Sequence, residues 1–290
     1  MSINPLVYLV QSPSDNKVRP WLYFTIDGVM VSAYEFMVSD RKRQKLIAEG
    51  WANILEFEGP VMLDSGGFQH LKGKQLSYSP EELARFGKES KADYVFSFDY
   101  PPRPSDRDFD SLSKRNLRNY VRMSKHVDAI FIVHAPPQLA SKEIRLLKRY
   151  RPLYVGVGGL VPSLRGAIKK TFQTIDLVQR ELPDSKMHLL GFAAPRVGAT
   201  YLSKAHSVDY AGWRTAAATS YLLTPNGYRK ITFRNKKGHA ARPNKAEQHI
   251  IRSICQHLGI PRCSLPRDFE ARAIFNAYVA MRIIKAKPVL

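Results

Sequence analysis

Four side chains suited to acid–base or nucleophilic chemistry stand at the ends of short apolar runs. They are Asp64, Asp99, His134 and Asp209. If the runs are parallel strands of a barrel, their carboxyl ends meet at one rim, and three carboxylates and an imidazole converge there. Each aspartate alone is explained equally well as the N-cap of a following helix. Three of them on one rim beside a histidine favour a functional site.

Such a group of carboxylates can act on an acetal-like carbon. One carboxylate can serve as a nucleophile and another as a general acid or base. Crowding raises the pKa of one of the carboxyl groups, which suits a general acid. A further carboxylate can accept hydrogen bonds from paired N–H donors, such as guanine N1–H and its exocyclic amine. The residue types therefore indicate chemistry at a glycosidic bond to a nucleobase.

The segment DSGGFQ (64–69) has the features of a loop that contacts a flat ligand. Gly66 and its neighbour allow close approach of the backbone, because no Cβ intervenes. Phe68 offers a ring for stacking on a base. Gln69 offers both a donor and an acceptor to a heterocycle edge. A second glycine pair, Gly158-Gly159, follows the apolar run LYVGV.

The positions of the apolar runs predict the fold class. Stretches with helical spacing separate them, at 80–91, 111–126, 140–150 and 164–181, so strand and helix alternate as in a parallel α/β protein. No GxGxxG follows the first run, and the length suits a (β/α)₈ TIM barrel. We count seven strands and leave the eighth unplaced, with KITF (230–233) as one candidate. The seven runs are 29–32, 61–63, 94–98, 129–133, 153–157, 187–191 and 206–209.

We expect residues 1–290 to form a single barrel domain. Residues 224–245 read as a basic insertion punctuated by Gly, Pro and Asn, and helices are expected at 246–258 and 268–286. Two cysteines exclude a disulfide scaffold and fit a reducing compartment. The N-terminus lacks the features of a secretory signal, and no apolar run reaches the ~18–20 residues that span a bilayer. These features predict a cytoplasmic protein without a membrane partner.

The charge balance points to a polyanionic partner. The chain has 45 Lys and Arg against 25 Asp and Glu, which gives a formal net charge of +20. Hydrophobic residues make up 44% of the chain, which excludes wholesale disorder. A solubilising surface seldom needs so uneven a balance, so the composition favours nucleic acid as the partner.

Several segments together resemble one known family. DSGGFQ is specific to the tRNA-guanine transglycosylases and their DNA-modifying relatives, and the order and spacing of the other segments match from about residue 60 to 215. The resemblance implies a (β/α)₈ barrel that exchanges a base in two steps through a covalent intermediate. The other matching segments are VFSFDYPP (95–102), IFIVHAPP (130–137), VGVGGL (155–160), LLGFAAPR (189–196) and SVDYAGW (207–213).

The resemblance also implies a role for each site residue. Asp209 is the expected nucleophile, Asp64 the general acid and base, and Asp99 the acceptor for the guanine edge. His134 stands where the tRNA enzymes usually have Gln, so its role is open between contact with the base and a purely structural one. The remaining residues expected in the base pocket are Ser65, Gly66, Phe68, Gln69, Gly158, Gly159 and Leu160.

The zinc site of the family is not recognisable in this sequence. The tRNA enzymes carry C-x-C-x-x-C…H near the C-terminus, whereas this chain has only Cys255 and Cys263. With His249 and His257 they make four weak candidate ligands, but the spacing matches no zinc motif. We therefore expect no cofactor and, without the dimer surface of that subdomain, a monomer.

Two features favour DNA as the substrate. One is the missing zinc subdomain. The other is Trp213, four residues after Asp209, as in the DNA 7-deazaguanine transglycosylases of bacteria and phages (the DpdA group). That resemblance implies that guanine leaves, that a 7-deazaguanine such as 7-cyano-7-deazaguanine enters, and that the modified DNA resists restriction. A tRNA-guanine transglycosylase of the queuosine or archaeosine type is the alternative. A non-catalytic nucleic-acid-binding barrel is less favoured, because Asp64 and Asp209 are both present.

A DNA substrate requires basic side chains around the site. The target guanine must leave the stack at a cost of a few kcal/mol, and contacts to the flanking phosphates offset this cost. Tyr228 and Phe233 interleave with the basic run and can stack on a displaced base. The residues expected to contact the nucleic acid are Lys72, Lys74, Arg196, Trp213, Arg214, Arg229, Lys230, Arg234, Lys236, Lys237, Arg242 and Lys245.

Overall fold

The computed structural model describes residues 4–12, 18–103, 106–160, 168–191, 199–231 and 242–286. The expectations for Arg196, Phe233, Arg234, Lys236 and Lys237 fall outside the described residues.

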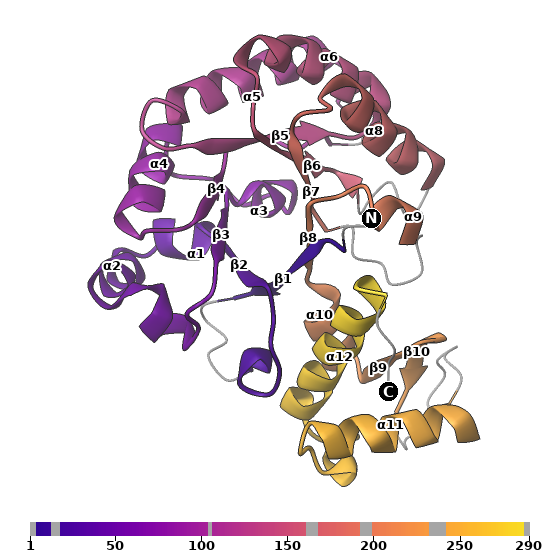
Figure 1. The fold of residues 1–290 in the computed structure, drawn as a ribbon. Helices are drawn as coiled ribbons and strands as arrows, with labels where there is room; N and C mark the ends of the chain where they lie inside the picture. The colour runs from indigo at the N-terminus through magenta and orange to yellow at the C-terminus, as the bar shows by residue number, and fades with distance from the viewer. Residues whose placement is uncertain are drawn as a thin grey trace.

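Eight parallel strands form a closed barrel, in which each strand pairs with its neighbours in chain order (Figure 1). β8 pairs with β1 to close the ring, with Leu6 opposite Ser207. This arrangement confirms the predicted (β/α)₈ architecture. The strands are β1 (Leu6–Gln11), β2 (Gly28–Ser32), β3 (Val61–Asp64), β4 (Tyr94–Phe96), β5 (Ala129–His134), β6 (Tyr154–Gly158), β7 (Lys186–Leu189) and β8 (Ser207–Tyr210).

The eighth strand lies at the N-terminus, so the candidate at 230–233 is wrong. Residues Gly227–Lys230 form β10, which pairs antiparallel with β9 (Tyr221–Thr224) in a separate two-stranded sheet. The two strands are joined through Asn226-Gly227, a dipeptide that favours a tight hairpin turn. β1 is apolar on both faces, as expected for a strand covered on both sides.

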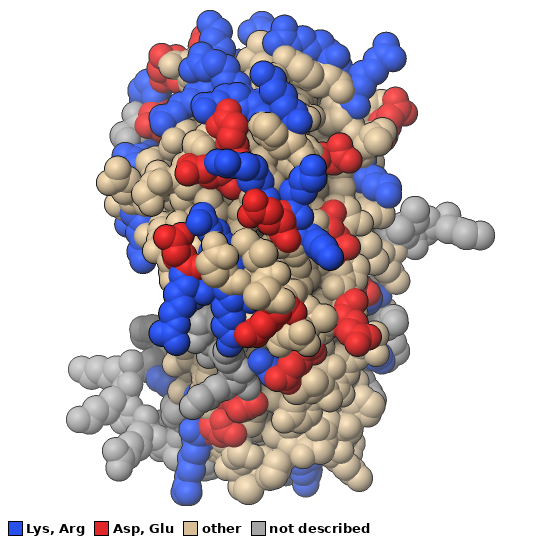
Figure 2. Space-filling model, turned by 90° about the vertical axis from the view of Figure 1, so that its left-hand side faces the viewer, with Lys and Arg blue, Asp and Glu red and all other residues tan. Residues whose placement is uncertain are grey.

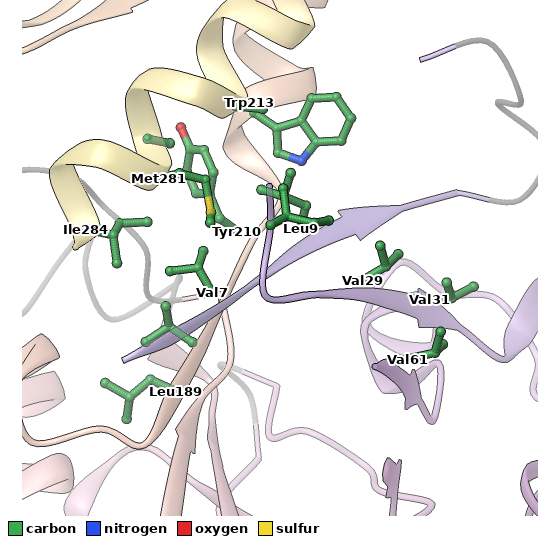
Figure 3. Packing of buried hydrophobic residues seen from close by; sticks show 14 of the residues in the cluster. Val7, Leu9, Val29, Val31, Val61, Leu189, Tyr210, Trp213, Met281 and Ile284 are labelled. Carbon is green, nitrogen blue, oxygen red and sulfur yellow. The ribbon is translucent and has the colours of Figure 1, made fainter. Parts of the chain in front are cut away.

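Alternate residues of the strands fill the barrel and pack against the helices outside it. Tyr8, Met30 and Met62 belong to the inner cluster, together with Phe96, Ile130 and Ile132. The residues between them in the strands, such as Val7, Leu9, Val29 and Val31, belong to the outer core (Figure 3). The barrel interior is therefore a packed core, which leaves the strand ends as the place for a site.

The helices cover the barrel in the order that the sequence predicts. α4 begins at Pro80 because Ser79 and Glu82 form a capping box, and α5 begins at Phe109 because Asp108 caps the Ser111 amide. The described helices are α1 (Tyr34–Met37), α2 (Asp40–Leu55), α3 (Gly67–Leu71), α4 (Pro80–Glu89), α5 (Phe109–Met123), α6 (Pro137–Leu147), α8 (Ile168–Glu181), α9 (Ala199–Leu202), α10 (Gly212–Ala218), α11 (Lys245–His257), α12 (Phe269–Ile284) and the 3₁₀ turns η1 (Pro20–Leu22), η2 (Lys148–Tyr150) and η3 (Arg262–Ser264).

The C-terminal helix α12 completes the outer layer of the barrel. Between β1 and β2 the described residues form only the short turn η1, and α12 packs on both β1 and η1. Met281 and Ile284 of α12 lie beside Val7 and Tyr210 (Figure 3). Lys285 adds an ion pair to Asp27, with Nζ and Oδ1 2.5 Å apart. No helix in the described part of the chain is long and apolar enough to cross a membrane.

Candidate active site

The four side chains singled out in the sequence lie at one rim of the barrel. Asp64 is the last residue of β3 and His134 is the last residue of β5. Asp209 lies in β8, one residue before its end, and Asp99 follows β4 by three residues. Since all eight strands run in parallel, these positions belong to the carboxyl end of the barrel. The structure therefore brings the predicted group together.

The carboxylate of Asp99 is held from two sides. One oxygen, Oδ1, accepts a hydrogen bond from the hydroxyl of Ser65, and Oδ2 pairs with Nε2 of His134 at 2.9 Å. A Cβ on Gly67 would stand 2.6 Å from Asp99 Oδ1, so glycine is required at this position of DSGGFQ. Asp99 and the side chain of Ser65 are buried, which makes the pair a fixed wall of the site.

His134 connects Asp99 to a second buried carboxylate, Glu143 of α6. Glu143 accepts from the His134 ring at Nδ1 (3.1 Å) and from the His134 backbone N–H (2.7 Å). Burial by itself lowers the pKa of His134, but the two carboxylates outweigh it and raise the pKa to about 10. The imidazolium is therefore the stable form, and both ring nitrogens are occupied. His134 therefore holds Asp99 in place and has no ring nitrogen left for a ligand.

Glu143 was not predicted as a site residue. A signal for it exists, because Leu139, Glu143 and Leu147 recur at four-residue spacing and all three are fully buried. A carboxylate on the buried stripe of a helix needs a partner. Asn116 of α5 supplies a further hydrogen bond, from Nδ2 to Glu143 Oε1 at 3.2 Å. The same amide holds Tyr100, accepting from its backbone N–H at 2.9 Å.

Asp209 has one oxygen occupied and one without a described donor. Oδ1 accepts from the Gly191 backbone N–H at 2.6 Å and pairs with His188 Nε2 at 3.3 Å. Within the described part of the chain, no donor reaches Oδ2. His188 is fixed in turn, because its Nδ1 lies 2.6 Å from Ser207 Oγ, and Ser207 also bonds to Tyr154. This buried chain orients the carboxylate, and His188 too was missed from sequence.

Asp64 is half-buried as a residue, and its carboxyl group, which is the buried part, has a raised pKa. Burial of its carboxyl, together with the negative charges of Asp99 and Asp209, raises the pKa of Asp64 to about 7. The Gly66 backbone N–H donates to Asp64 Oδ2 at 3.1 Å and opposes the shift without cancelling it. A carboxyl group with this pKa holds or releases a proton near neutral pH, as a general acid and base requires.

The other expected pocket residues lie in the segments at the carboxyl ends of β3 and β6. Phe68 is 55% exposed, and Lys72 Nζ lies 4.5 Å from its ring centroid. Gln69 is partly exposed in α3. Gly158 ends β6, next to His134 of β5. Gly159 and Leu160 follow, but the Leu160 side chain is fully buried in the outer core, so only its backbone is available to a ligand.

Trp213 does not take the position expected of it. Its indole is fully buried, beside α12 and next to Leu9 (Figure 3). The residue lies in α10, and the first turn of that helix directs it into the core and not toward the barrel mouth. The buried ring is unavailable to a nucleic acid, which corrects the expectation placed on it.

The described basic residues of the 224–245 segment lie in β10 and around the start of α11. β10 reaches the barrel rim through Tyr228, whose hydroxyl lies 2.9 Å from that of Tyr210 at the end of β8. Arg229 of β10 pairs with the buried Glu247 of α11 at 2.8 Å, so this guanidinium is engaged within the protein. β10 and α11 lie beyond α12 from the barrel strands (Figure 1). Lys and Arg side chains also gather elsewhere, most densely toward the top of the face in Figure 2. The positive charge is therefore not confined to the segment.

The other described residues that were expected to contact the nucleic acid are at least partly exposed. Lys230 and Arg214 are partly exposed, and Lys72, Lys74, Arg242 and Lys245 are exposed.

The four weak zinc candidates do not form a cluster. Cys255 is buried in α11, whereas Cys263 is exposed in η3. His257 packs against Tyr278, with ring centroids 5.3 Å apart. Among the described residues, which include His249, no three His, Cys, Asp or Glu side chains are arranged to hold a metal ion.

Comparison with known proteins gives a consistent set of relatives. They are tRNA-guanine(15) transglycosylases. The protein of Picrophilus torridus is 28% identical over 162 residues, which cover 54% of this chain and 25% of the relative. That of Methanopyrus kandleri is 28% identical over 185 residues, or 58% and 39%. That of Thermoplasma volcanium is 24% identical over 246 residues, or 78% and 38%.

The chain thus spans about a quarter to two fifths of the length of these relatives. No family model matches the chain. The similarity supports the resemblance to the tRNA-guanine transglycosylase superfamily that the motifs indicate. It does not single out the DNA-modifying group.

Proposed function

We propose that this chain is a guanine transglycosylase that exchanges guanine in a nucleic acid for another base. The observation that carries the proposal is that Asp209 and Asp64 lie on the same rim of the barrel. Asp209 is oriented through Oδ1, which leaves Oδ2 without a donor among the described residues, and Asp64 on the same rim has a pKa near neutrality. A nucleophile and a proton donor are the two groups that breaking a glycosidic bond requires.

The first half-reaction releases guanine. Asp209 Oδ2 attacks C1′ of the target nucleoside, and the bond from C1′ to guanine N9 breaks. The electron pair of that bond goes to guanine, which takes a proton from Asp64. The product is an ester between Asp209 and C1′. The phosphodiester bonds are untouched, so the strand stays intact.

The second half-reaction is the reverse with a different base. Asp64, now a carboxylate, takes the proton from the incoming base as its nitrogen attacks C1′. The bond from C1′ to Asp209 breaks, and the carboxylate is regenerated. The residues that hold Asp209 Oδ1, Gly191 and His188, keep the leaving carboxylate in the orientation from which the next cycle starts.

Asp99 is the proposed reader of the guanine edge. Its carboxylate has about four acceptor sites, of which Ser65 and His134 occupy two. The others are suited to the N1–H and exocyclic amine of guanine or of a 7-deazaguanine. The imidazolium of His134 balances the negative charge of Asp99, which lowers the cost of burying that carboxylate beside a neutral base.

The relatives favour tRNA over DNA as the nucleic acid. All of those named above are tRNA-guanine(15) transglycosylases. One of the two sequence features that favoured DNA was Trp213, and its burial removes that support. We therefore propose tRNA as the substrate, with a 7-deazaguanine as the incoming base and DNA as the competing outcome of the test.

The substrate is tested by incubating the protein with a radiolabelled 7-deazaguanine and either total tRNA or duplex DNA. We expect label in tRNA. Label in DNA alone would overturn the choice of tRNA, and label in neither would overturn base exchange with this class of base. The control is Asp184→Asn, an exposed acid between α8 and β7 at the opposite end of the barrel, which should label as the wild type does.

The pH dependence of guanine release tests the role of Asp64. Because its pKa is raised to about 7, the carboxyl is protonated below that pH and loses the proton above it. We expect the single-turnover rate of guanine release to fall as the pH rises through about 7. Asp64→Asn should slow release by about 10²–10⁴-fold and remove this pH dependence. A wild-type release rate that stays constant or rises between pH 6 and 9 would exclude Asp64 as the acid.

A further inference from the structure

A cavity of about 570 Å³ lies next to the candidate active site. Its wall includes Tyr100, which follows Asp99 directly in the chain, and His70 of α3, which follows the DSGGFQ segment. Arg115 on α5 also lines the cavity. Tyr100 in the cavity wall is the residue after Asp99, which is proposed to read guanine. The cavity and the candidate active site therefore share the segment that follows β4.

Three arginines give the cavity its chemistry: Arg103, Arg107 and Arg115. Within the part of the chain that the structure describes, neither Arg103 nor Arg115 forms an ion pair with a carboxylate. The two aspartates in the wall are engaged with backbone amides. Asp106 accepts from the Arg103 N–H at 2.7 Å, and Asp108 accepts from the Ser111 N–H as the N-cap of α5.

The guanidinium groups are oriented by rings. The Arg115 guanidinium carbon lies 3.4 Å from the centroid of the Tyr100 ring, so its donors remain available around the edge. Arg103 Nη2 lies 3.2 Å from His70 Nε2. Burial and the charge of Arg103 lower the pKa of His70, so its ring is neutral and accepts this hydrogen bond. Oriented guanidinium edges next to an aromatic ring are suited to a phosphate and an adjoining base.

We propose that this cavity binds the nucleotide next to the exchanged guanosine, with Arg103 and Arg115 on its phosphate. The inference rests on the proposed function. The volume falls within the range of about 300–1,000 Å³ typical of small-ligand sites and exceeds what one phosphate needs. Consecutive nucleotides are joined through their sugars, so the neighbour of a guanosine seated between Asp209 and Asp99 leaves the site from the sugar side, and the proposal places it in the cavity that starts at Tyr100. The site therefore holds the substrate strand in register with the nucleophile.

The test uses the full chain with Arg103→Gln, Arg115→Gln and the double variant. The matched control is Arg118→Gln, an exposed arginine on α5 that does not line the cavity. Affinity for fluorescein-labelled tRNA is measured by anisotropy at several salt concentrations. We expect each single variant to weaken binding by about 10-fold. The slope of log affinity against log salt should fall by about one unit per lost phosphate contact.

Base exchange provides the second readout. In the double variant we expect KM for tRNA to rise while KM for the incoming base stays unchanged, because the cavity contacts only the strand. Equal tRNA affinity and equal salt slope in the double variant and in Arg118→Gln would overturn the proposal. Binding is measured without turnover, so the two proposals can fail separately. If tRNA binding depends on Arg103 and Arg115 but the wild-type protein exchanges no base, the proposed function is wrong and the cavity proposal stands.

Discussion

Asp209→Asn is expected to abolish the covalent intermediate and to reduce guanine release by about 10³-fold or more. The amide has no negative charge with which to attack C1′. Its carbonyl oxygen still accepts from the Gly191 N–H, so the fold around β8 should be preserved. The protein is mixed with substrate nucleic acid and quenched in denaturant, and the protein–nucleic acid adduct is quantified by electrophoresis.

The matched control for this experiment is Asp184→Asn, the same chemical change at the opposite end of the barrel. It should form the adduct at the wild-type level. Nucleic-acid affinity of Asp209→Asn should remain close to that of the wild type, because the arginines and lysines are unchanged. An adduct formed by Asp209→Asn at the wild-type rate would assign the nucleophile to another residue.

Glu143→Gln is expected to lower the free energy of unfolding by about 3–5 kcal/mol, the usual result of breaking a buried ion pair. Glu143 accepts hydrogen bonds from the His134 backbone, the His134 ring and Asn116. A glutamine turns one of these acceptors into a donor that faces other donors, and it leaves the imidazolium with one carboxylate in place of two. Urea unfolding near pH 6 measures the loss.

The pH dependence of stability tests the same network. The folded-state pKa of His134 is raised from 6.5 to about 10, so its contribution is fully present below pH 6.5 and is lost as the pH rises through 10. We expect the wild-type free energy of unfolding to fall across this window, and to fall less in Glu143→Gln. The control, Glu81→Gln, removes a partly exposed carboxylate from its pair with Arg122 and should cost at most about 1 kcal/mol. If the two variants lose equal stability and keep the same pH slope, His134 is not a buried imidazolium.

Much of the fold and the centre of the site could be predicted from the sequence, because the chemical side chains follow the strands directly. A residue that ends an apolar run is placed by the run itself, as Asp64 and His134 show. β1 was missed although its sequence, LVYLVQ, is apolar on both faces. A short apolar run near the N-terminus is recognised as a barrel strand only once its pairing with β2 and β8 is known.

The residues that support the site could not be predicted in the same way. Glu143 meets His134 from a helix, and His188 meets Asp209 from the neighbouring strand, so each contact depends on how distant segments pack. Trp213 shows the reverse error. Its closeness to Asp209 in sequence suggests a place at the barrel mouth, but the turn of α10 directs it into the core beside α12.

The basic residues illustrate a third limit. Arg229 was grouped with the other cations by sequence, whereas the structure pairs it with Glu247 in the capping box of α11. Arg103 stands outside any basic run, and Arg115 lies in the run KRNLR (114–118), to which we assign no role from the sequence because such a run is typical of a helix surface. They come together only through the turn between β4 and α5.

The most direct test of base exchange is guanine release from a strand that stays whole. Substrate tRNA with labelled guanine is incubated with the protein and an excess of unlabelled guanine, and the tRNA is then run on a denaturing gel. Base exchange predicts that labelled guanine enters solution while the tRNA remains full length and free of abasic sites. Abasic sites or cleaved strands would identify a hydrolase, and retention of all the label would contradict the role assigned to Asp209 and Asp64.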